Sequence, residues 1–597
     1  MSADSSENIP PTQSTPREFT VRAVVLGVAL ALILGAANAY LGMYAGLTVS
    51  ASIPAAVISM AILRVMGGAT ILENNVVQTI ASAGEAVAAG AIFTFPAIVI
   101  IGGGRSLHYA EVTALSAAGA TMGALLVVFL RRAYIVEERL PYPEGLACAQ
   151  VLRAGAESAN IRPLAIAGAA SAALKALQDL FGIIPAAISG ARWIGSAAFA
   201  GSFDISAALA GVGYIIGVRI AALVFAGGAF AWLIAIPVLT AMHPVEGIPD
   251  AAAAAMQLWR GQVRYLGVGA MLTGGVVTLW RLRARISAAL ADSVRVVRER
   301  HVEAGAREDT DLSARAVITA VALCVPVIFI ICLALSGSIV LSAALAALLV
   351  VIGFFASAIA GYLTGIVGAS NNPVSGVTVI VLLAVALFLK LAGVPASAGP
   401  RLAILAGAVV CTAAAMAGDS THDLATGWHV GATPRTLEIG VLIGALASSF
   451  LMAPILNLLI AGYGIAGTPS ARAGALAAPQ AFLMAKVAQG VFQGGLPIGT
   501  IAAGAFLAAL LALIDSRLER IGSKWRTPIM PVAIGLYLPM GLSAVIFAGA
   551  LIRAWMGADE ADDSGPGILI AAGLVAGEAL MGVASGALVT AGIHLPI

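Results

Sequence analysis

The chain has 597 residues, of which 60% are apolar and only 10% are charged, and its mean hydropathy is +1.00. These averages exclude a soluble globular protein and are typical of an all-α, polytopic helical membrane protein. The formal net charge of +2 does not indicate nucleic-acid binding, because the basic residues occur in short clusters between apolar runs.

The N-terminal stretch 1–18 is polar and rich in Pro and Ser, which predicts a disordered cytoplasmic tail. It lacks the basic start, short apolar run and cleavage site of a removable signal peptide. The four cysteines are scattered, without the spacing of a zinc site or a disulfide framework. We therefore expect neither a metal site nor a cofactor.

Apolar runs near the ~20 residues needed to cross a bilayer occur about sixteen times, and some of the helices are expected to be broken or re-entrant. The runs are 20–43, 47–66, 75–102, 110–131, 162–188, 206–222, 223–242, 263–281, 313–335, 338–360, 374–394, 400–418, 437–462, 496–514, 529–553 and 567–592. Two divisions stay open, since 162–190 could be two half-helices and 206–242 could split differently.

The charged stretch 282–312 predicts a cytoplasmic linker between an N-terminal transmembrane half (19–281) and a C-terminal half (313–597). Basic residues follow the second, fourth, eighth and fourteenth runs, and an acidic stretch follows the fifteenth. Lys and Arg accumulate in short cytoplasmic loops, so this pattern predicts an even number of crossings with both termini in the cytoplasm.

Two short echoes suggest internal repeats, which are common in transporters. Tyr40-Leu41 with Gly46 recurs as Tyr362-Leu363 with Gly368, and AGEA at 83–86 recurs at 576–579. The two echoes do not share one register. Chance similarity in a chain rich in Ala and Gly is the alternative.

Two glutamates fall inside apolar runs, Glu85 in ASAGEAVAAG and Glu578 in LVAGEALMGV. An ionised group at the centre of a membrane helix costs about 2.5–3.5 kcal/mol or more. Surroundings of low dielectric favour the protonated carboxyl, so each glutamate is a candidate for reversible proton binding. A structural, hydrogen-bonded glutamate at a helix crossing is the alternative for both.

The stretch 418–434, GDSTHDLATGWHVGATP, gathers carboxylates, imidazoles and hydroxyls between two apolar runs. Polar groups at membrane depth persist only inside protein or beside a water-filled cavity. We therefore expect this stretch, which includes Asp419, His422 and Asp423, to form part of a translocation site near a membrane face. An ordinary solvated loop is the alternative.

A second interruption, GYLTGIVGASNNPVSG at 361–376, places Gly, Asn and Pro residues between apolar runs. The helix that begins after Pro373 would present free N–H groups to an anionic moiety, and Asn371 and Asn372 would suit a peptide bond. A plain interhelical turn is the alternative. A similar polar concentration in the N-terminal half comprises Tyr40, Tyr44, Asn38, Asn74, Asn75 and Gln78.

Other charged residues in apolar surroundings receive structural interpretations. Lys175 and Asp179 are four residues apart on one helix face and are expected to neutralise each other. Lys486 is expected to extend to the membrane interface rather than face a cavity. The sequence has no phosphate-binding loop and no HExxH or GxSxG motif, so an ATP-driven pump or a membrane hydrolase has little support.

Taken together, these motifs resemble the oligopeptide transporter (OPT) family, which includes peptide carriers and the yellow stripe-like metal-chelate carriers. The similar stretches extend along the whole chain, at 73–97, 135–155, 369–380, 417–435 and 571–583. The resemblance implies about sixteen helices and import coupled to the proton gradient. The chain departs from the family pattern Gln-Asp-Leu-Lys-Thr-Gly, since it has His422 and Ala425 in place of the Gln and the Lys, which leaves the charge preference for substrate open.

The leading hypothesis is a secondary active transporter of the bacterial inner membrane that imports small peptides or peptide-like compounds by proton symport. A metal-chelate symporter is the alternative, and a membrane enzyme or a passive channel has less support. The expected partners are the substrate, protons and the lipid bilayer, and the oligomeric state stays open. The proton-coupling candidates are Glu85, Glu578, His422 and Asp423; the substrate-binding candidates are Tyr40, Asn74, Asn75, Gln78, Tyr362, Asn371, Asn372, Ser375, Asp419 and Thr426.

Overall fold

The computed structural model describes residues 17–593, apart from 47, 104–105, 159–161, 243–249, 275, 278–279, 282–306, 370–371, 373, 473–474, 495–496, 524, 558–565 and 592. Within this part of the chain, eleven helices are long and apolar enough to cross a membrane. The prediction of a polytopic helical membrane protein is confirmed. Most of the expected linker 282–312 lies outside the described residues.

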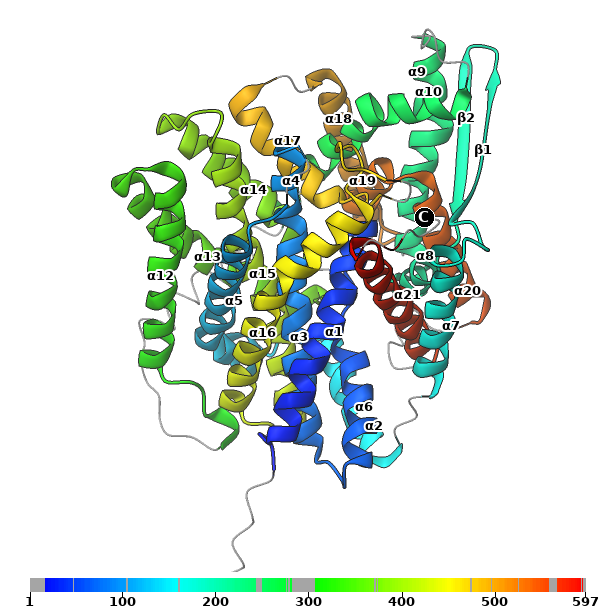
Figure 1. Ribbon diagram of the computed structural model, residues 1–597. Helices are drawn as coiled ribbons and strands as arrows, with labels where there is room; N and C mark the ends of the chain where they lie inside the picture. The colour runs from blue at the N-terminus through cyan, green and yellow to red at the C-terminus, as the bar shows by residue number, and fades with distance from the viewer. Residues whose placement is uncertain are drawn as a thin grey trace, which may run out of the picture.

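The N-terminal half forms ten described α-helices, three π-helical turns and a β-hairpin (Figure 1). They are α1 (Val21–Ala45), α2 (Ser52–Val65), α3 (Ile71–Thr94), α4 (Pro96–Ile101), α5 (Tyr109–Arg131), η1 (Arg132–Glu137), α6 (Pro143–Ser158), α7 (Arg162–Asp179), β1 (Ala187–Ile194), β2 (Ala197–Asp204), α8 (Ala207–Ala229), η2 (Phe230–Ala235), α9 (Ile236–Met242), α10 (Ala251–Leu258) and η3 (Trp259–Val263). Residues 264–274 continue as helix.

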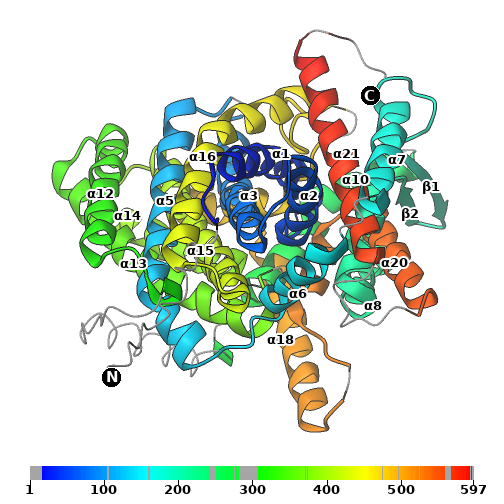
Figure 2. The same cartoon turned by 90° about the horizontal axis from the view of Figure 1, so that it is seen from below.

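The C-terminal half is helical throughout its regular elements within the described residues. It comprises η4 (Arg307–Asp309), α12 (Ala314–Ser336), α13 (Ile339–Val367), α14 (Val374–Leu391), α15 (Gly399–Val430), α16 (Pro434–Tyr463), α17 (Pro479–Gln493), α18 (Ile498–Arg520), α19 (Ile529–Tyr537), α20 (Met540–Trp555) and α21 (Pro566–Thr590). Seen from below, α3 lies near the centre, with α12–α14 on one side and α7, α8, α20 and α21 on the other (Figure 2).

Helices α3 and α15 cross antiparallel at the centre of the molecule. A Cβ atom built on Gly90 of α3 would lie 2.5 Å from the Cα atom of Thr412 in α15. Towards the other end of the contact, a Cβ atom on Gly427 would lie 3.3 Å from Oδ1 of Asn75. Small residues therefore let the two backbones approach closely, as is common between membrane helices.

Each central helix pairs with a second long helix that ends at a glycine with positive φ. Helix α1 packs on α3 and ends at Gly46, with φ +73°; α13 packs on α15 and is followed by Gly368, with φ +87°. Both glycines belong to the Tyr-Leu echo and permit a backbone conformation that other residues rarely adopt. A short helix, α2 or α14, follows each break, so the two halves contain similar three-helix units of opposite direction.

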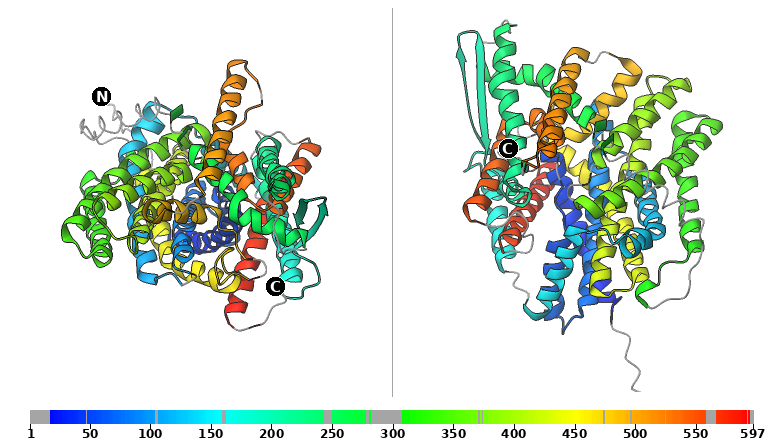
Figure 3. Two further views of the ribbon diagram at one scale, coloured as in Figure 1. Left: turned by 90° about the horizontal axis from the view of Figure 1, so that it is seen from above. Right: turned by 180° about the vertical axis from the view of Figure 1, so that it is seen from behind.

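The region after α7 corrects two predicted spans. Residues 187–204, partly included in the expected run 162–188, form an antiparallel hairpin in which Ala187 pairs with Asp204. The hairpin lies beside α9 and α10 at the edge of the molecule (Figure 3). The runs 206–222 and 223–242 form one helical segment that is interrupted at Gly217, with φ +79° and ψ +167°. Buried Arg553 donates to the carbonyl oxygens of Tyr214 and Ile215, which the interruption deprives of helical partners.

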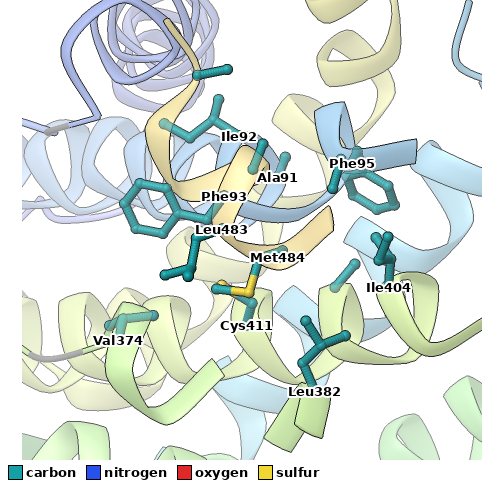
Figure 4. Packing of buried hydrophobic residues seen from close by; sticks show 14 of the residues in the cluster. Ala91, Ile92, Phe93, Phe95, Val374, Leu382, Ile404, Cys411, Leu483 and Met484 are labelled. Carbon is teal, nitrogen blue, oxygen red and sulfur yellow. The ribbon is translucent and has the colours of Figure 1, made fainter. Parts of the chain in front are cut away.

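The main hydrophobic core surrounds the upper part of α3. Leu483 and Met484 of α17 lie close to Phe93 of α3, Cys411 of α15 and Leu382 of α14 (Figure 4). These side chains are buried, so they hold α17 against the central pair. Another residue of α17, Phe482, lies against Arg264.

The packing of α1 on α3 predicts a strong effect of one methyl group. A Cβ atom on Gly84 would lie 2.4 Å from the carbonyl oxygen of Ala31, so Gly84→Ala should separate these helices and destabilise the fold by about 1–3 kcal/mol. Gly499→Ala is the matched control, because nothing lies within 4 Å of its Cβ position in α18. Thermal unfolding of the purified protein in detergent should show a lower midpoint for Gly84→Ala only; equal midpoints would contradict the close contact.

Candidate functional site

A seam of polar side chains runs along the contact between α3 and α15. On α3 the spacing of Asn75, Gln78, Ser82 and Glu85 places all four on one helical face, and all are buried. The facing residues of α15 include Asp423, which Gln78 contacts, and Asp419, which lies near Glu85. The expected break at 418–434 is wrong for most of that stretch, because α15 continues to Val430, and the burial of its polar residues excludes a solvated loop.

Direct hydrogen bonds join the two sides of the seam. Gln78 Nε2 donates to Asp423 Oδ1 at 2.5 Å, and Asn75 Nδ2 donates to Gln78 Oε1 at 2.9 Å. His422 Nε2 lies 4.0 Å from Asp423 Oδ1, and both side chains are buried. A chain of amide and carboxyl groups therefore links α3 to α15 within the protein interior.

Glu85 connects the seam to the broken segment after α1. One of its carboxyl oxygens accepts a hydrogen bond from the backbone N–H of Ala51, the residue immediately before α2. Asp419, Glu144 and Asp423 lie close enough to Glu85 to interact with it electrostatically. The sequence did not point to Glu144, which lies in the first turn of α6.

Asn372, in the break before α14, also lies beside α15. Its Nδ2 atom donates to Thr364 Oγ1 at 3.0 Å and to the carbonyl oxygen of Ala360 at 3.2 Å. A Cβ atom on Gly418 would lie 2.5 Å from Asn372 Nδ2, so α15 passes directly beside this amide. Tyr362 packs edge-on against Tyr134, with ring centroids 5.5 Å apart. Ser375 lies in the first turn of α14, while Asn371 and Pro373 lie outside the described residues.

Several buried polar atoms in this region have no hydrogen-bond partner within the described part of the chain. They belong to α3, α15 and the segment before α14, and are Asn75 Oδ1, Thr79 Oγ1, Asn372 Oδ1, Ser420 Oγ and His422 Nε2. Buried polar atoms are nearly always paired in folded proteins. Unpaired polar atoms in one region, among them the amide oxygens of Asn75 and Asn372, are typical of a site that binds a polar molecule.

Three of the predicted residues have other partners. Asn74 Oδ1 accepts from Ser59 Oγ at 3.0 Å and so ties α3 to α2, while Thr426 Oγ1 donates to the carbonyl oxygen of Gly145 at 3.1 Å. Tyr40 stacks on Tyr44 with ring centroids 5.8 Å apart. Tyr40 thus belongs to a second polar cluster, between α1, α7, α16 and α21.

This second cluster also contains Glu578. Its carboxyl oxygens accept from Ser206 Oγ at 2.7 Å and from the backbone N–H of Ala208 at 2.8 Å, at the start of α8. Nearby, Lys175 Nζ lies 2.9 Å from Asp179 Oδ1, as the spacing predicted, and Tyr463 donates to Asp179 Oδ2 at 3.2 Å. Glu578 therefore has a well-satisfied structural environment, and these two hydrogen bonds tie it to α8 rather than to the α3–α15 seam.

Comparison with known proteins agrees with this architecture. The family model described as "OPT oligopeptide transporter protein" matches residues 18–589. The chain belongs to the OPT family. It is also 33% identical over 584 residues to a protein of Haemophilus influenzae named "Putative oligopeptide transporter", with 91% of each chain covered. The predicted family resemblance is confirmed.

Within the described residues of this OPT-family chain, no group of three or more His, Cys, Asp or Glu side chains is arranged to hold a metal ion. The four cysteines are buried and separate. The acidic residues of the seam are interleaved with amides and hydroxyls instead. This composition is suited to hydrogen bonding and proton binding.

Asp419 is only partly buried, whereas its neighbours Gly418 and Ser420 are fully buried. We expect Asp419→Cys, in a background without the four native cysteines, to react with a charged, membrane-impermeant thiol reagent. Ala417→Cys, at a fully buried position of the same helix, should stay unreactive. Labelling measured by mass spectrometry checks this difference, and absence of reaction at Asp419→Cys would show that this position does not face water.

Proposed function

We propose that this OPT-family transporter imports small peptides or peptide-like compounds by proton symport, with cargo and protons passing along the α3–α15 seam. The observation that carries the proposal is the seam itself, in which buried carboxyl and amide groups lie between two broken-helix units. Such groups are costly in a membrane and are retained where substrates or protons pass. Sites near the midplane beside broken helices are also usual in secondary transporters.

Protons would act through Glu85. Ionised carboxylates repel one another strongly in a low-dielectric interior, so proton binding lowers the electrostatic cost of bringing Glu85 close to Asp419 and Asp423. Glu85 also accepts a hydrogen bond from the backbone N–H of Ala51, immediately before α2. Protonation weakens this charge-assisted hydrogen bond, which would release the segment between α1 and α2 and so couple proton binding to a change of shape.

The cargo would complete hydrogen bonds that the protein leaves open. Asn75 Oδ1, Asn372 Oδ1 and Thr79 Oγ1 are acceptors without partners in the described part of the chain, and peptide N–H groups are their natural complements. Asn75 belongs to α3, whereas Asn372 packs against Thr364 of α13 and Gly418 of α15. A peptide held between them would bridge the two inverted units.

We also propose that the protein lies in the plasma membrane with its N-terminus in the cytoplasm. The residues that precede α1 meet the end of the charged linker, since Arg307 lies 3.0 Å from Glu18. Arg131, at the end of α5, lies 2.5 Å from Asp311 of the same linker. Basic residues concentrated at one end of a membrane protein mark its cytoplasmic side.

Proteoliposomes test the coupling directly. An inwardly directed proton gradient should increase uptake of labelled alanine peptides, and Glu85→Gln should reduce gradient-driven uptake about tenfold or more, because a permanent amide cannot exchange a proton. Glu111→Gln is the control, since Glu111 pairs with Arg401 away from the seam. It should leave the gradient dependence unchanged.

Two results would contradict the symport proposal. Uptake that does not depend on the proton gradient would refute proton coupling. Preferential uptake of metal chelates over peptides in the same vesicles would show that the substrates are metal chelates. Analysis of the internal contents also separates transport from catalysis, because a transporter leaves its cargo chemically unchanged.

The position of Asn372 gives a separate prediction. Gly418→Ala should displace the Asn372 amide, because the new methyl group would lie 2.5 Å from Nδ2 and 2.9 Å from Thr364 Oγ1. We expect uptake to fall about tenfold or more, by analogy with misplaced polar groups in other sites. Gly407→Ala in the same helix is the control, since its nearest neighbour, Leu382 Cδ1, is 3.4 Å away. Equal uptake by the two variants would exclude Asn372 from the substrate site.

A further inference from the structure

Arg264 is a buried cation without a carboxylate within 4 Å in the described part of the chain. It is 2% exposed and begins the helical residues 264–274. Its guanidinium carbon lies 3.4 Å from the ring centroid of Phe482, 4.9 Å from that of Tyr537 and 5.1 Å from that of Trp259. The guanidinium also donates to the Tyr537 hydroxyl. Aromatic faces attract a cation but do not neutralise its charge.

Arg131 is an equally buried arginine and differs from Arg264 in having charged partners. Its side chain is also 2% exposed, but it lies 2.5 Å from Asp311 and 3.6 Å from Asp309. A buried charge normally requires an opposite charge and saturated hydrogen bonds. Arg264 has neither within the described residues, since its Nε atom has no hydrogen-bond partner there.

The surroundings of Arg264 contain further donors and a second cation. Lys486 Nζ lies 5.2 Å from the centroid of the same Phe482 ring, and its nearest polar partner is Gln489 at 3.4 Å. The buried indole N–H of Trp259 has no partner among the described residues. Lys486 and Tyr265 are partly exposed, so this region can be reached from outside the packed core. The two cations and the unpaired N–H donors of Arg264 and Trp259 suit this cage to an anion, while the ring faces hold the guanidinium in place.

The cage is physically connected to the broken segment after α1. Phe482 lies in α17, whose first residue, Pro479, would be 2.1 Å from a Cβ atom on Gly46. The backbone N–H of Ala478 donates to the carbonyl oxygen of Met43 at 2.8 Å. Ala51, five residues after Gly46 in the chain, donates its backbone N–H to the Glu85 carboxylate. An anion at Arg264 therefore lies at one end of a continuous chain of contacts whose other end is Glu85.

We propose that Arg264, assisted by Lys486, binds the carboxylate of the transported compound, which in a peptide is the C-terminal carboxylate. This assignment rests on the transport function proposed above and specifies which cargo it favours. Guanidinium groups bind carboxylates through two parallel hydrogen bonds, and a water-poor cage strengthens that pairing. Lys486, which the sequence assigned to the membrane interface, would then attract the anion towards the cage.

The test compares alanine tripeptide with its C-terminal amide, because the two differ only in the carboxylate. Binding to the purified protein is measured by calorimetry, and uptake is measured in proteoliposomes. The wild type should bind the free acid about tenfold or more tighter than the amide. Arg264→Gln should lose this preference while binding of the amide stays unchanged, Arg264→Lys should keep part of it, and Lys486→Gln should reduce it.

Arg131→Gln is the matched control. It removes an equally buried arginine and should lower the melting temperature without changing the ratio of acid to amide affinity. An unchanged ratio in Arg264→Gln overturns the proposal. If Arg264→Gln does not fold, Arg264→Lys and Lys486→Gln decide, since retention of the full preference in both variants overturns it as well.

A separate measurement distinguishes this proposal from the transport function. Absence of tripeptide uptake by the wild type refutes peptide transport, whereas tighter calorimetric binding of the free acid that depends on Arg264 still supports the anion site. Melting temperatures in nanodiscs of neutral lipid, with and without phosphatidylglycerol, test a competing occupant. Stabilisation by the anionic lipid that disappears in Arg264→Gln would assign the cage to a lipid phosphate and overturn the carboxylate assignment.

Discussion

The close antiparallel contact of α3 and α15 is the constraint on which the rest of the structure depends. Gly90 leaves no room for a side chain between the two backbones at Thr412, so the polar residues farther along the contact face one another. Gln78 and Asp423 consequently pair across the contact rather than with water. Packing thus supplies the low dielectric in which a single proton or hydrogen bond has a large effect.

The same local device recurs where a membrane helix begins after an interruption. Glu85 accepts from the N–H of Ala51 before α2, and Glu578 accepts from the N–H of Ala208 at the start of α8. Each glutamate follows a glycine that packs on a neighbouring helix, which explains why AGEA occurs twice. Glu578 has additional support from Ser206, whereas Glu85 lies near other carboxyl groups. Both glutamates therefore accept from a backbone N–H near a helix start, and Glu85 is the one that binds the proton in the proposed mechanism.

Composition predicted the membrane class, because long apolar runs are visible in the sequence, and the motifs shared with the OPT family predicted the family. It did not predict that α15 continues through Asp423, since a helix with a buried polar face lacks the continuous apolar run used to recognise a span. The hairpin 187–204 was missed because nearly all of it lies between the predicted runs 162–188 and 206–222, where no regular element was expected. Glu144 and Arg264 could not be predicted, since their significance depends on neighbours distant in the chain.

The α3–α15 seam and the cage around Arg264 differ in charge, so they suit different parts of a peptide. The α3–α15 seam carries carboxyl groups and unpaired acceptors, while the cage around Arg264 carries cations and unpaired donors. A peptide has the complementary arrangement, with N–H groups along its backbone and a carboxylate at one end. Because α17 contacts the break at Gly46, occupation of the cage and the state of Glu85 act on the same segment of chain. In the proposed mechanism, cargo at the cage and the proton on Glu85 would influence each other through the stretch between α1 and α2, in addition to their contacts along the seam.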